Sequence, residues 1–335
     1  MSDRQRLREE FLNKHGWGGV DCPLLAGDAS FRKYYRLNRN NTSVVLMDAP
    51  PPEAVEPFVK IAEFLLQYGF SAPQILAQDT DNGFLLLEDL GDDTYTRLLQ
   101  NGADERALYK LATDVLVELH KDVTKHLPDD IPDYDEEMLT KECLLLPDWW
   151  MKAALGENSV SEEMRDSYIE AWQPAFELVQ KQPKVLVLRD FHVDNLLHLP
   201  QRDSFSACGL LDFQDAVLGS GIYDVMSLLE DARRDIKPAL IEEMKMRYTR
   251  SFPDLDAEEF DTIFAILGAQ RHAKVIGIFA RLCMRDNKPM YLHHIPRVWR
   301  LFEHSIRHPA LKDVRKWVDT HIAKDIRGIP ACLQP

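Results

Sequence analysis

The sequence predicts an α+β fold with two lobes, a small antiparallel-sheet lobe at residues 1–90 and a larger helical lobe at residues 91–335. Three observations predict it. The first lobe alternates strand-like and helix-like segments in the order β-β-α-β-β. Helical periodicity dominates after Gly91. The length of 335 residues suffices for one large domain or two ordinary ones.

Turn and cap residues divide the small lobe into its elements. The turn N-R-N-N separates two runs rich in β-branched and aromatic residues, F-R-K-Y-Y-R-L and S-V-V-L-M-D-A. Gly69 is placed to end a helix at its C-terminal cap. The expected elements are a helix at 4–14, two strands within 31–48, a helix at 54–68, and strands at 73–78 and 83–88.

The larger lobe is expected to be mostly helical, with two strands among the helices. The expected strands lie at 184–188 and 207–213. The expected helices lie at 93–100, 104–121, 135–155, 160–181, 222–234, 239–250, 257–286 and 296–322. A cleft between two such lobes is a common place for a ligand.

Composition and termini favour a reduced cytoplasmic protein. The five cysteines are dispersed and lack C-x-x-C spacing, which argues against a cysteine zinc site. The charged start M-S-D-R-Q-R-L-R-E-E-F has no apolar signal core, and no apolar run approaches the ~18 residues of a membrane span. The net charge of −15 argues against a nucleic-acid partner. No obligate protein partner is evident.

A group of polar residues interrupts the apolar pattern at 188–199, L-R-D-F-H-V-D-N-L-L-H-L. The segments L-L-H-L and C-G-L-L on either side of residues 200–207 predict a β-hairpin with a long loop. Asn195 precedes the first strand of this hairpin and Asp212 follows the second. Paired strand residues lie about 5 Å apart, so these two side chains are expected to be neighbours. Asp190 lies five residues upstream on the same loop.

Two carboxylates and a carboxamide at one sheet end suit phosphoryl transfer. Hard oxygen ligands hold Mg²⁺ while the ion keeps waters and substrate phosphates in its shell. A carboxylate that is not a ligand can orient and deprotonate a hydroxyl. Taken singly, Asp and Asn at these positions are better explained as turn residues, and only their combination with the hairpin favours function.

The motif R-D-F-H-V-D-N followed by L-L-D-F resembles the catalytic loop and metal-binding motif of the protein-kinase-like superfamily, in its aminoglycoside phosphotransferase branch. The resemblance implies the bilobal protein-kinase-like fold. It also implies that Asp190 is the catalytic base, with Arg189 and His192 beside it on the loop, and that Asn195 and Asp212 hold Mg²⁺. His192 could support the loop by hydrogen bonding or touch a phosphate.

Two further features belong to this resemblance. The segment Y-D-V-M-S-L-L is similar to a family helix whose aspartate, here Asp224, braces the catalytic loop through backbone N–H groups. Two positions depart from the usual loop: Leu188 replaces a His and Arg189 replaces a common Gly.

Several blocks resemble the family of bacterial anomeric N-acetylmuramate/N-acetylglucosamine kinases of peptidoglycan recycling. The blocks are G-D-A-S-F-R-K-Y-Y-R-L, V-L-M-D-A-P-P, F-L-L-L-E-D-L-G, L-L-D-F-Q-D-A-V-L-G and Q-R-H-A-K-V-I-G-I-F-A-R-L, in this order. Those enzymes phosphorylate the anomeric hydroxyl of the sugar. The resemblance therefore implies ATP and Mg²⁺ as cofactors and a small sugar as acceptor.

The nucleotide site implied by this resemblance consists of a loop over the phosphates and a hinge that meets adenine. The strand V-V-L-M-D lacks the Lys that other kinases direct at the phosphates, and Met47 or a neighbour takes its place. Arg32 or Lys33 could supply the missing positive charge. The nucleotide-binding candidates are Gly27, Ser30, Phe31, Arg32, Lys33, Met47, Glu88, Asp89 and Leu90.

Basic residues of one predicted helix suggest the sign of the acceptor. Arg271, Lys274, Arg281 and Arg285 fall within an ~80° sector, which describes either a solvated face or a positive wall of the acceptor site. An anionic acceptor, such as a sugar with a lactyl carboxylate, suits this charge better than a polycationic aminoglycoside. The acceptor-binding candidates are Asp215, Arg271, His272 and Arg281.

Other functions remain open at this point. The runner-up is an aminoglycoside or choline-type kinase, which would need an acidic pocket. A catalytically degenerate kinase-like binding protein is a further alternative, and the missing strand Lys is its best support. A metallohydrolase built on His192, Asp194 and His198 would need more histidines at short spacing than the sequence has nearby.

Overall fold

A computed structural model of the chain describes residues 3–27, 31–121 and 127–333. The chain divides into two compact units. The sheet unit comprises Met1–Glu118, Lys125–Asp130 and Val193–Ala216, and the helical unit comprises Leu119–Thr124, Ile131–His192 and Val217–Pro335. These units are groups of residues in mutual contact, so each contains several separate stretches of the chain. They therefore differ from the predicted lobes 1–90 and 91–335, and the boundary between those lobes stays a prediction.

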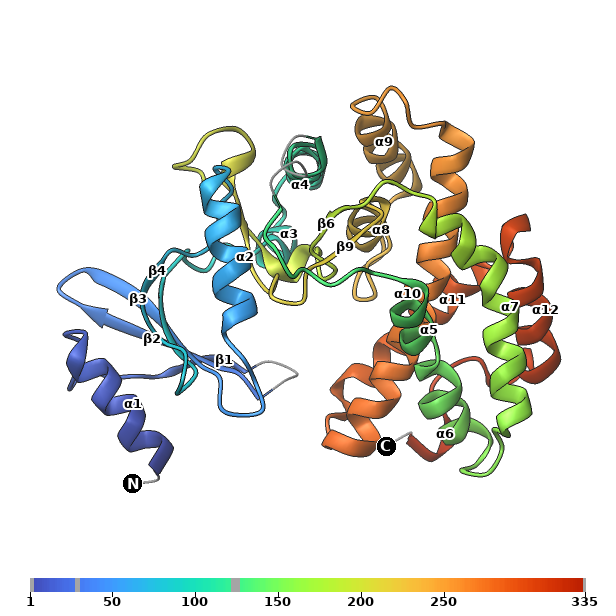
Figure 1. The fold of residues 1–335 in the computed structure, drawn as a ribbon, viewed down its shortest axis with the longest axis horizontal. Coiled ribbons are helices and arrows are strands. Elements are labelled where there is room, and N and C mark those ends of the chain that lie inside the picture. The colour runs from blue at the N-terminus through green and yellow to red at the C-terminus, as the bar shows by residue number, and fades with distance from the viewer. Residues whose placement is uncertain (1–2, 28–30, 122–126, 334–335) are drawn as a thin grey trace. The chain divides into compact units, whose positions relative to one another are not determined.

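A five-stranded antiparallel sheet is the framework of the sheet unit, with strand order β1-β2-β3-β5-β4 (Figure 1). Its strands are β1 (Leu24–Gly27), β2 (Lys33–Arg39), β3 (Thr42–Asp48), β4 (Ile75–Asp79) and β5 (Phe84–Glu88). The predicted order β-β-α-β-β is confirmed for β2 to β5. The sequence did not predict β1, because L-L-A-G shows no alternation of apolar and polar residues.

Helix α1 (Asp3–Lys14) covers one face of this sheet, which we call the α1 face. Phe11 and Leu12 of α1 pack against apolar side chains of the sheet, which are Leu37, Val44, Leu46, Phe84 and Leu86. Because successive strand side chains point to opposite faces, the even-numbered residues of β3 belong to the α1 face. Asp48 extends this row, and Arg4 of α1 donates to its carboxylate at 2.7 Å.

Helix α2 (Glu56–Gln67) follows β3 and runs alongside the sheet (Figure 1). Its buried side chains recur at helical spacing, with Phe58, Ile61, Ala62 and Leu65 on one stripe. Gly69 has φ = +81°, the left-handed conformation that ends a helix, as its place in the sequence predicts.

A β-hairpin of β7 (Leu196–His198) and β8 (Cys208–Leu210) also belongs to the sheet unit. Leu196 pairs with Leu210, which confirms the predicted hairpin. Leu210 N–H donates to the carbonyl of Ser71 at 2.9 Å, so the hairpin is fixed to the segment between α2 and β4. The preceding helices are α3 (Tyr95–Gln100) and α4 (Glu105–Lys121).

The helical unit is built around α10 (Ala257–Asp286), which packs against α5, α8 and α11 (Figure 1). By length and composition α10 could cross a membrane, but its most apolar stretch is 83% buried inside the protein, as in a core helix. The other elements are α5 (Glu136–Cys143), η2 (Leu146–Met151), α6 (Lys152–Leu155), α7 (Glu162–Gln180), β6 (Val185–Val187), β9 (Val217–Gly219), α8 (Ile222–Leu229), α9 (Pro238–Thr249), η5 (Pro289–His294), α11 (Ile295–Ser305), η6 (Pro309–Leu311) and α12 (Lys312–His321).

Prolines account for two differences from the predicted helices. The helix expected at 296–322 is two helices, α11 and α12, separated near Pro309. A proline disfavours helical backbone at the residue before it, and His308 has the extended ψ of 137°. The helix expected at 135–155 is likewise divided, and Pro147 lies in the middle segment η2. The strand β9, which pairs with β6, was not predicted.

Gly277 is where α10 comes closest to the chain before η2. A Cβ atom at this position would lie 2.1 Å from the carbonyl oxygen of Leu145. We expect Gly277→Ala to lower the free energy of unfolding by about 1–3 kcal/mol, because overpacking outweighs the ~1 kcal/mol gain in helix propensity. Urea denaturation measures the change. Arg285→Ala, an exposed position on the same helix, should change stability little, and a stabilised Gly277→Ala protein would contradict the close packing.

Candidate functional site

The backbone after β6 is held by a buried carboxylate of α8. Asp224 is fully buried and accepts hydrogen bonds from the backbone N–H of Leu188 at 2.7 Å and of Arg189 at 2.9 Å. His120 lies behind it, with Nε2 3.9 Å from Asp224, and its Nδ1 is 2.9 Å from the Tyr248 hydroxyl. Asp224 thus fixes the start of the loop that carries Asp190. It does so by accepting backbone N–H groups, which is the contact that the resemblance implies for this residue.

Arg189 stands in the left-handed region of backbone space, with φ = +68°. This conformation costs a residue with a Cβ atom about 1–2 kcal/mol, and glycine would adopt it without this cost. The Arg189 side chain turns to the helical unit's interior, where it forms an ion pair with Glu142 and lies over the ring of Tyr134 at 5.6 Å.

Glu142 of α5 is the centre of a cluster in the helical unit. Its carboxylate binds Arg189, accepts from Lys274 at 2.8 Å and from Gln270 at 3.1 Å, and also accepts from the Tyr134 hydroxyl. Burial alone would raise the pKa of Glu142, but Lys274 and Arg189 outweigh it and lower this pKa to about 2. The carboxylate is therefore ionised at neutral pH. Glu142 belongs to no motif, so the sequence gives no sign of its role.

Asp190 lies beside Arg271, with 3.6 Å between a carboxylate oxygen and the guanidinium. Its side chain is 41% exposed, whereas that of Arg271 is 6% exposed. Desolvation opposes ionisation of Asp190, but nearby cations, with Lys274 and Arg271 first among them, hold its pKa below the ordinary value. The carboxylate is therefore charged at neutral pH and able to accept a hydrogen bond from a hydroxyl.

His192 is buried two residues further along the loop. Its Nε2 lies 3.5 Å from a terminal nitrogen of Arg233, in the segment that follows α8. Burial, and then the charge of Arg233, lower the pKa of His192 to about 4. The imidazole is neutral at pH 7 and can accept a hydrogen bond from Arg233.

Asn195 and Asp212 meet at the end of the hairpin in the sheet unit. The Leu211 N–H donates to the Asn195 carbonyl at 2.9 Å, and the Asn195 carboxamide donates to the Asp212 carboxylate at 3.4 Å. Gln214 donates to the other Asp212 oxygen at 2.7 Å. Asp212 has φ = +59°, a conformation that Asp tolerates better than most residues. The predicted proximity of Asn195 and Asp212 is confirmed.

The candidate residues before and within β2 differ in exposure. Phe31 is 66% exposed, Arg32 is buried and Lys33 is exposed. Arg32 Nε lies 3.4 Å from the carboxylate of Glu53, a residue that the sequence analysis did not select. Gly27 ends β1, whereas Ser30 lies outside the described residues.

The remaining nucleotide candidates lie on β3 and at the end of β5. Met47 is fully buried. Glu88 receives a hydrogen bond from Arg202 at 2.5 Å, and Asp89 receives one from Arg36 at 2.9 Å. These contacts hold the segment after β5, and Leu90 is partly buried.

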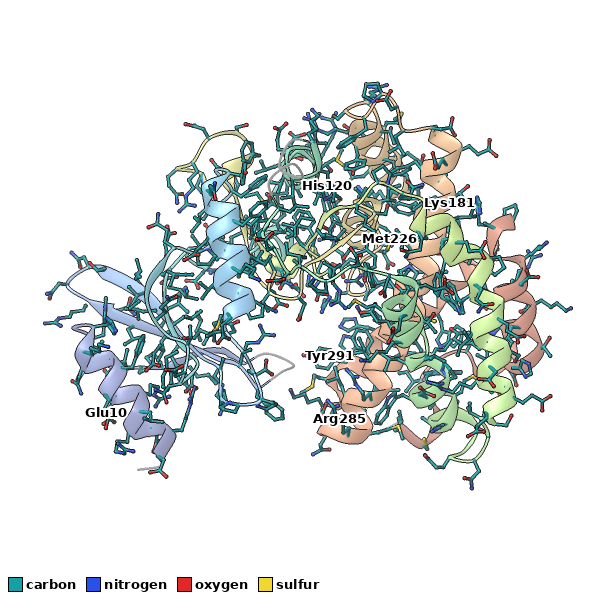
Figure 2. All side chains as sticks on the ribbon, viewed as in Figure 1. Glu10, His120, Lys181, Met226, Arg285 and Tyr291 are labelled. Carbon is teal, nitrogen blue, oxygen red and sulfur yellow. The ribbon has the colours of Figure 1, made fainter. Side chains whose placement is uncertain are left out.

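The acceptor candidates do not share one surface. Arg271 turns towards Asp190, and His272 is buried against Glu230 at 2.7 Å. Arg281 is partly buried. Arg285 lies at the end of α10, where it is exposed and pairs with Asp286 (Figure 2). The basic residues of α10 therefore do not form a single solvated face. Asp215 is exposed in the sheet unit.

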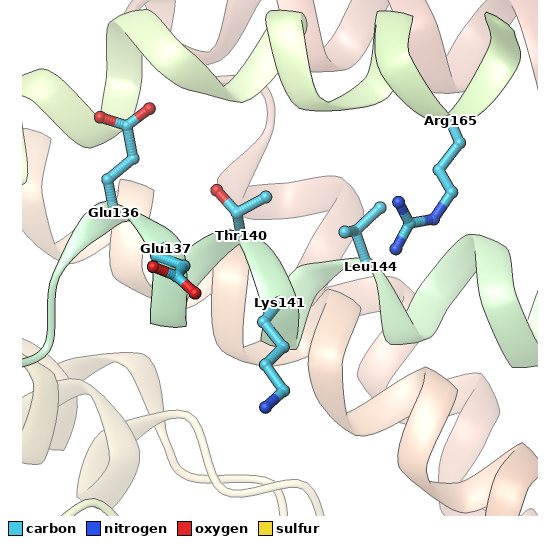
Figure 3. Close-up of a pocket in the computed structure, with 6 residues that line it drawn as sticks. All are labelled: Glu136, Glu137, Thr140, Lys141, Leu144 and Arg165. Atoms are coloured by element: carbon cyan, nitrogen blue, oxygen red, sulfur yellow. The ribbon is translucent and has the colours of Figure 1, made fainter. Parts of the chain in front are cut away.

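A surface hollow of the helical unit lies away from these residues. It is lined by side chains of α5 and its C-terminal end, with Arg165 of α7 opposite (Figure 3). The α5 residues are Glu136, Glu137, Thr140 and Lys141, followed by Leu144. None of them is a candidate from the sequence, and their mixed charges give no reason to place the chemistry there.

Comparisons with known proteins agree with this description. The family model described as the phosphotransferase enzyme family matches residues 21–260. An N-acetylmuramate/N-acetylglucosamine kinase of Caulobacter vibrioides is 34% identical over 97% of this chain and 99% of its own length. One of Pseudomonas aeruginosa is 40% identical over 94% of this chain and 96% of its own.

Solved structures show the fold. A choline/ethanolamine kinase family protein of Mesorhizobium loti has a TM-score of 0.61 at 14% identity, covering 93% of this chain and 99% of its own. An ADP-bound aminoglycoside phosphotransferase has a TM-score of 0.58 at 18% identity, covering 88% of this chain and 95% of its own. These likenesses confirm the predicted protein-kinase-like α+β fold.

The left-handed backbone at Arg189 predicts an order of stability among its variants. Both Arg189→Ala and Arg189→Gly lose the contact with Glu142, and only the glycine relieves the conformation at φ = +68°. We expect Arg189→Gly to be more stable than Arg189→Ala by about 1 kcal/mol, measured by urea denaturation. A more stable Arg189→Ala protein would contradict the left-handed conformation. Alanine is the more stable choice where φ is negative, because glycine loses more backbone entropy on folding.

The lowered pKa of Glu142 predicts how stability depends on pH. A carboxyl whose pKa falls on folding, here from 4.5 to about 2, stabilises the protein fully above pH ~4.5 and loses this contribution as the pH falls towards 2. The shift corresponds to about 3 kcal/mol. The difference in unfolding free energy between the wild type and Glu142→Gln should therefore be constant from pH 7 to 5 and shrink below that. A difference that does not change with pH would rule out the ionised cluster.

Proposed function

Because this chain belongs to the phosphotransferase enzyme family, we propose that it transfers the γ-phosphate of ATP to the anomeric hydroxyl of N-acetylmuramate and N-acetylglucosamine. The two relatives described above carry this substrate pair in their names and align over nearly the whole chain. The observation that carries the chemistry is the loop after β6, braced by Asp224 and bearing an ionised Asp190.

Asp190 is the proposed catalytic base. Its carboxylate is charged and partly exposed, so it can accept the hydrogen bond of a sugar hydroxyl. It would take the hydroxyl proton as the sugar oxygen bonds to the γ-phosphorus and the bond from that phosphorus to the bridging oxygen breaks, which releases ADP. Arg189 and His192 belong to the same loop, and they position Asp190 by holding the loop in its conformation. Arg189 fixes the loop to Glu142, and His192 fixes it to Arg233.

Asn195 and Asp212 are the proposed Mg²⁺ ligands. Their side chains lie side by side, with the Asn195 carboxamide nitrogen 3.4 Å from the Asp212 carboxylate. Carboxylate and carboxamide oxygens are hard donors of the kind that Mg²⁺ prefers when phosphates and waters complete its shell. The described residues contain no group of three or more His, Cys, Asp or Glu side chains placed to hold a metal. Bound Mg²⁺ supplies positive charge to the β- and γ-phosphates.

The charges near Asp190 favour an anionic or neutral acceptor. Arg189 and Lys274 pair with Glu142, and Arg271, which also lies near Asp231, pairs with Asp190 in this part of the helical unit. A polycationic aminoglycoside or a choline-type acceptor would be repelled by the three cations. Arg271 is the foremost candidate for acceptor contact, whereas His272 is held by Glu230. A cytoplasmic role in peptidoglycan recycling is part of this proposal.

The proposal is tested by ATP consumption with Mg²⁺ against N-acetylmuramate, N-acetylglucosamine, glucose, choline and kanamycin. We expect turnover with the two amino sugars. Asp190→Asn should lower kcat by about 10²–10⁴-fold, because it removes the base, and leave the Kd for ATP nearly unchanged. Asp203→Asn, an exposed change of the same kind in the hairpin loop, is the matched control.

The other outcomes separate the rival functions. Turnover with kanamycin or choline alone would refute the acceptor and keep the chemistry. Failure to bind ATP would refute the kinase proposal and favour a catalytically degenerate binding protein.

A further inference from the structure

The central strand of the sheet supplies no cation for the phosphates of ATP. In kinases of this fold a Lys of the corresponding strand, paired with a Glu, contacts the nucleotide phosphates. The strand β3 has Met47 at its buried end, and Met47 is fully buried between its strand partners Tyr34 and Leu85. The proposed function therefore requires a positive charge from another element.

The register of β2 and β3 separates the two available cations onto opposite faces. Lys33 pairs with Asp48, so it points to the α1 face, where Arg4 already occupies Asp48. Tyr34 pairs with Met47 on the other face. Arg32 directly precedes β2, and continuing the alternation of the strand side chains places it on the same face as Tyr34 and Met47. Arg32 thus lies at the end of the sheet next to Met47.

Glu53 holds this arginine in place. One oxygen of its carboxylate lies 3.4 Å from Arg32 Nε, and the other accepts from the backbone N–H of Phe31 at 3.2 Å. Both partners are largely buried, with 8% of the Arg32 side chain and 19% of the Glu53 side chain exposed. A buried guanidinium is stable only when it is paired, and this pair fixes it beside the chain that enters β2.

We propose that Arg32, positioned by Glu53, binds the phosphates of ATP in place of the missing strand lysine, and that Lys33 takes no part. The assignment rests on the proposed kinase function. The pair reproduces the Lys–Glu arrangement on different elements, with the cation moved to the residue just before β2 and the acid placed just before α2. A guanidinium suits this task because its planar fork binds phosphate oxygens in pairs.

The test compares the binding of ATP, ADP and adenosine to the full chain with Mg²⁺ by calorimetry. We expect Arg32→Gln to weaken ATP and ADP at least about 10-fold, as the loss of a charged phosphate contact implies, and to leave adenosine binding unchanged. Arg32→Lys should restore part of the affinity. Lys33→Gln is the matched control on the adjacent, exposed residue and should bind all three ligands as the wild type does.

Glu53→Gln tests the positioning role without removing the phosphate contact. It should raise KM for ATP several-fold with a smaller change in kcat, and it should add little in the Arg32→Gln background, since coupled residues are non-additive. Equal effects of Glu53→Gln in both backgrounds would overturn the positioning role.

The outcomes distinguish this assignment from the kinase proposal. Weakened ATP binding in Lys33→Gln but not in Arg32→Gln would overturn the assignment and leave the kinase proposal intact. The same holds if Arg32→Gln weakens adenosine as much as ATP, because the effect would then be structural. A wild-type protein that binds no adenine nucleotide would overturn both. Should Arg32→Gln fail to fold, Arg32→Lys and Glu53→Gln still decide the question.

Discussion

The hydrogen bonds from two backbone N–H groups to Asp224 are the constraint on which the candidate site depends. They turn the chain at the end of β6 and force Arg189 into left-handed backbone. This turn directs the Arg189 side chain to Glu142 and presents Asp190 beside Arg271. An unfavourable conformation at one residue is thus held by a fully buried carboxylate, as functional loops often show.

Ion pairs also hold the loop that carries Asp190 in place. Three cations lie close to two carboxylates, and this arrangement keeps both Asp190 and Glu142 ionised although Glu142 is largely buried. A protein of net charge −15 therefore gathers positive charge at the place where its chemistry is expected. These three cations are the reason that we propose an anionic or neutral acceptor.

The sequence was most informative where function is encoded locally. The hairpin, the proximity of Asn195 and Asp212, and most strands and helices follow from alternation, turn residues and caps. Contacts between distant segments could not be predicted. Glu142 and Glu53 are ordinary acidic residues in the sequence, and only the packing of α10 and the register of β2 reveal their partners. The left-handed conformation of Arg189 was hidden for the same reason, since it is imposed by Asp224, 35 residues away.

Glu142 is shielded from solvent, so its ion pairs depend little on ionic strength. Dissolved ions screen exposed pairs such as Arg6–Glu10, but they reach a pair inside the protein far less. The side chains of Glu142, Arg189 and Lys274 are each no more than 16% exposed, so added salt leaves the loop in its shape. A change in acceptor affinity between low and high salt would then report the charge of the acceptor itself.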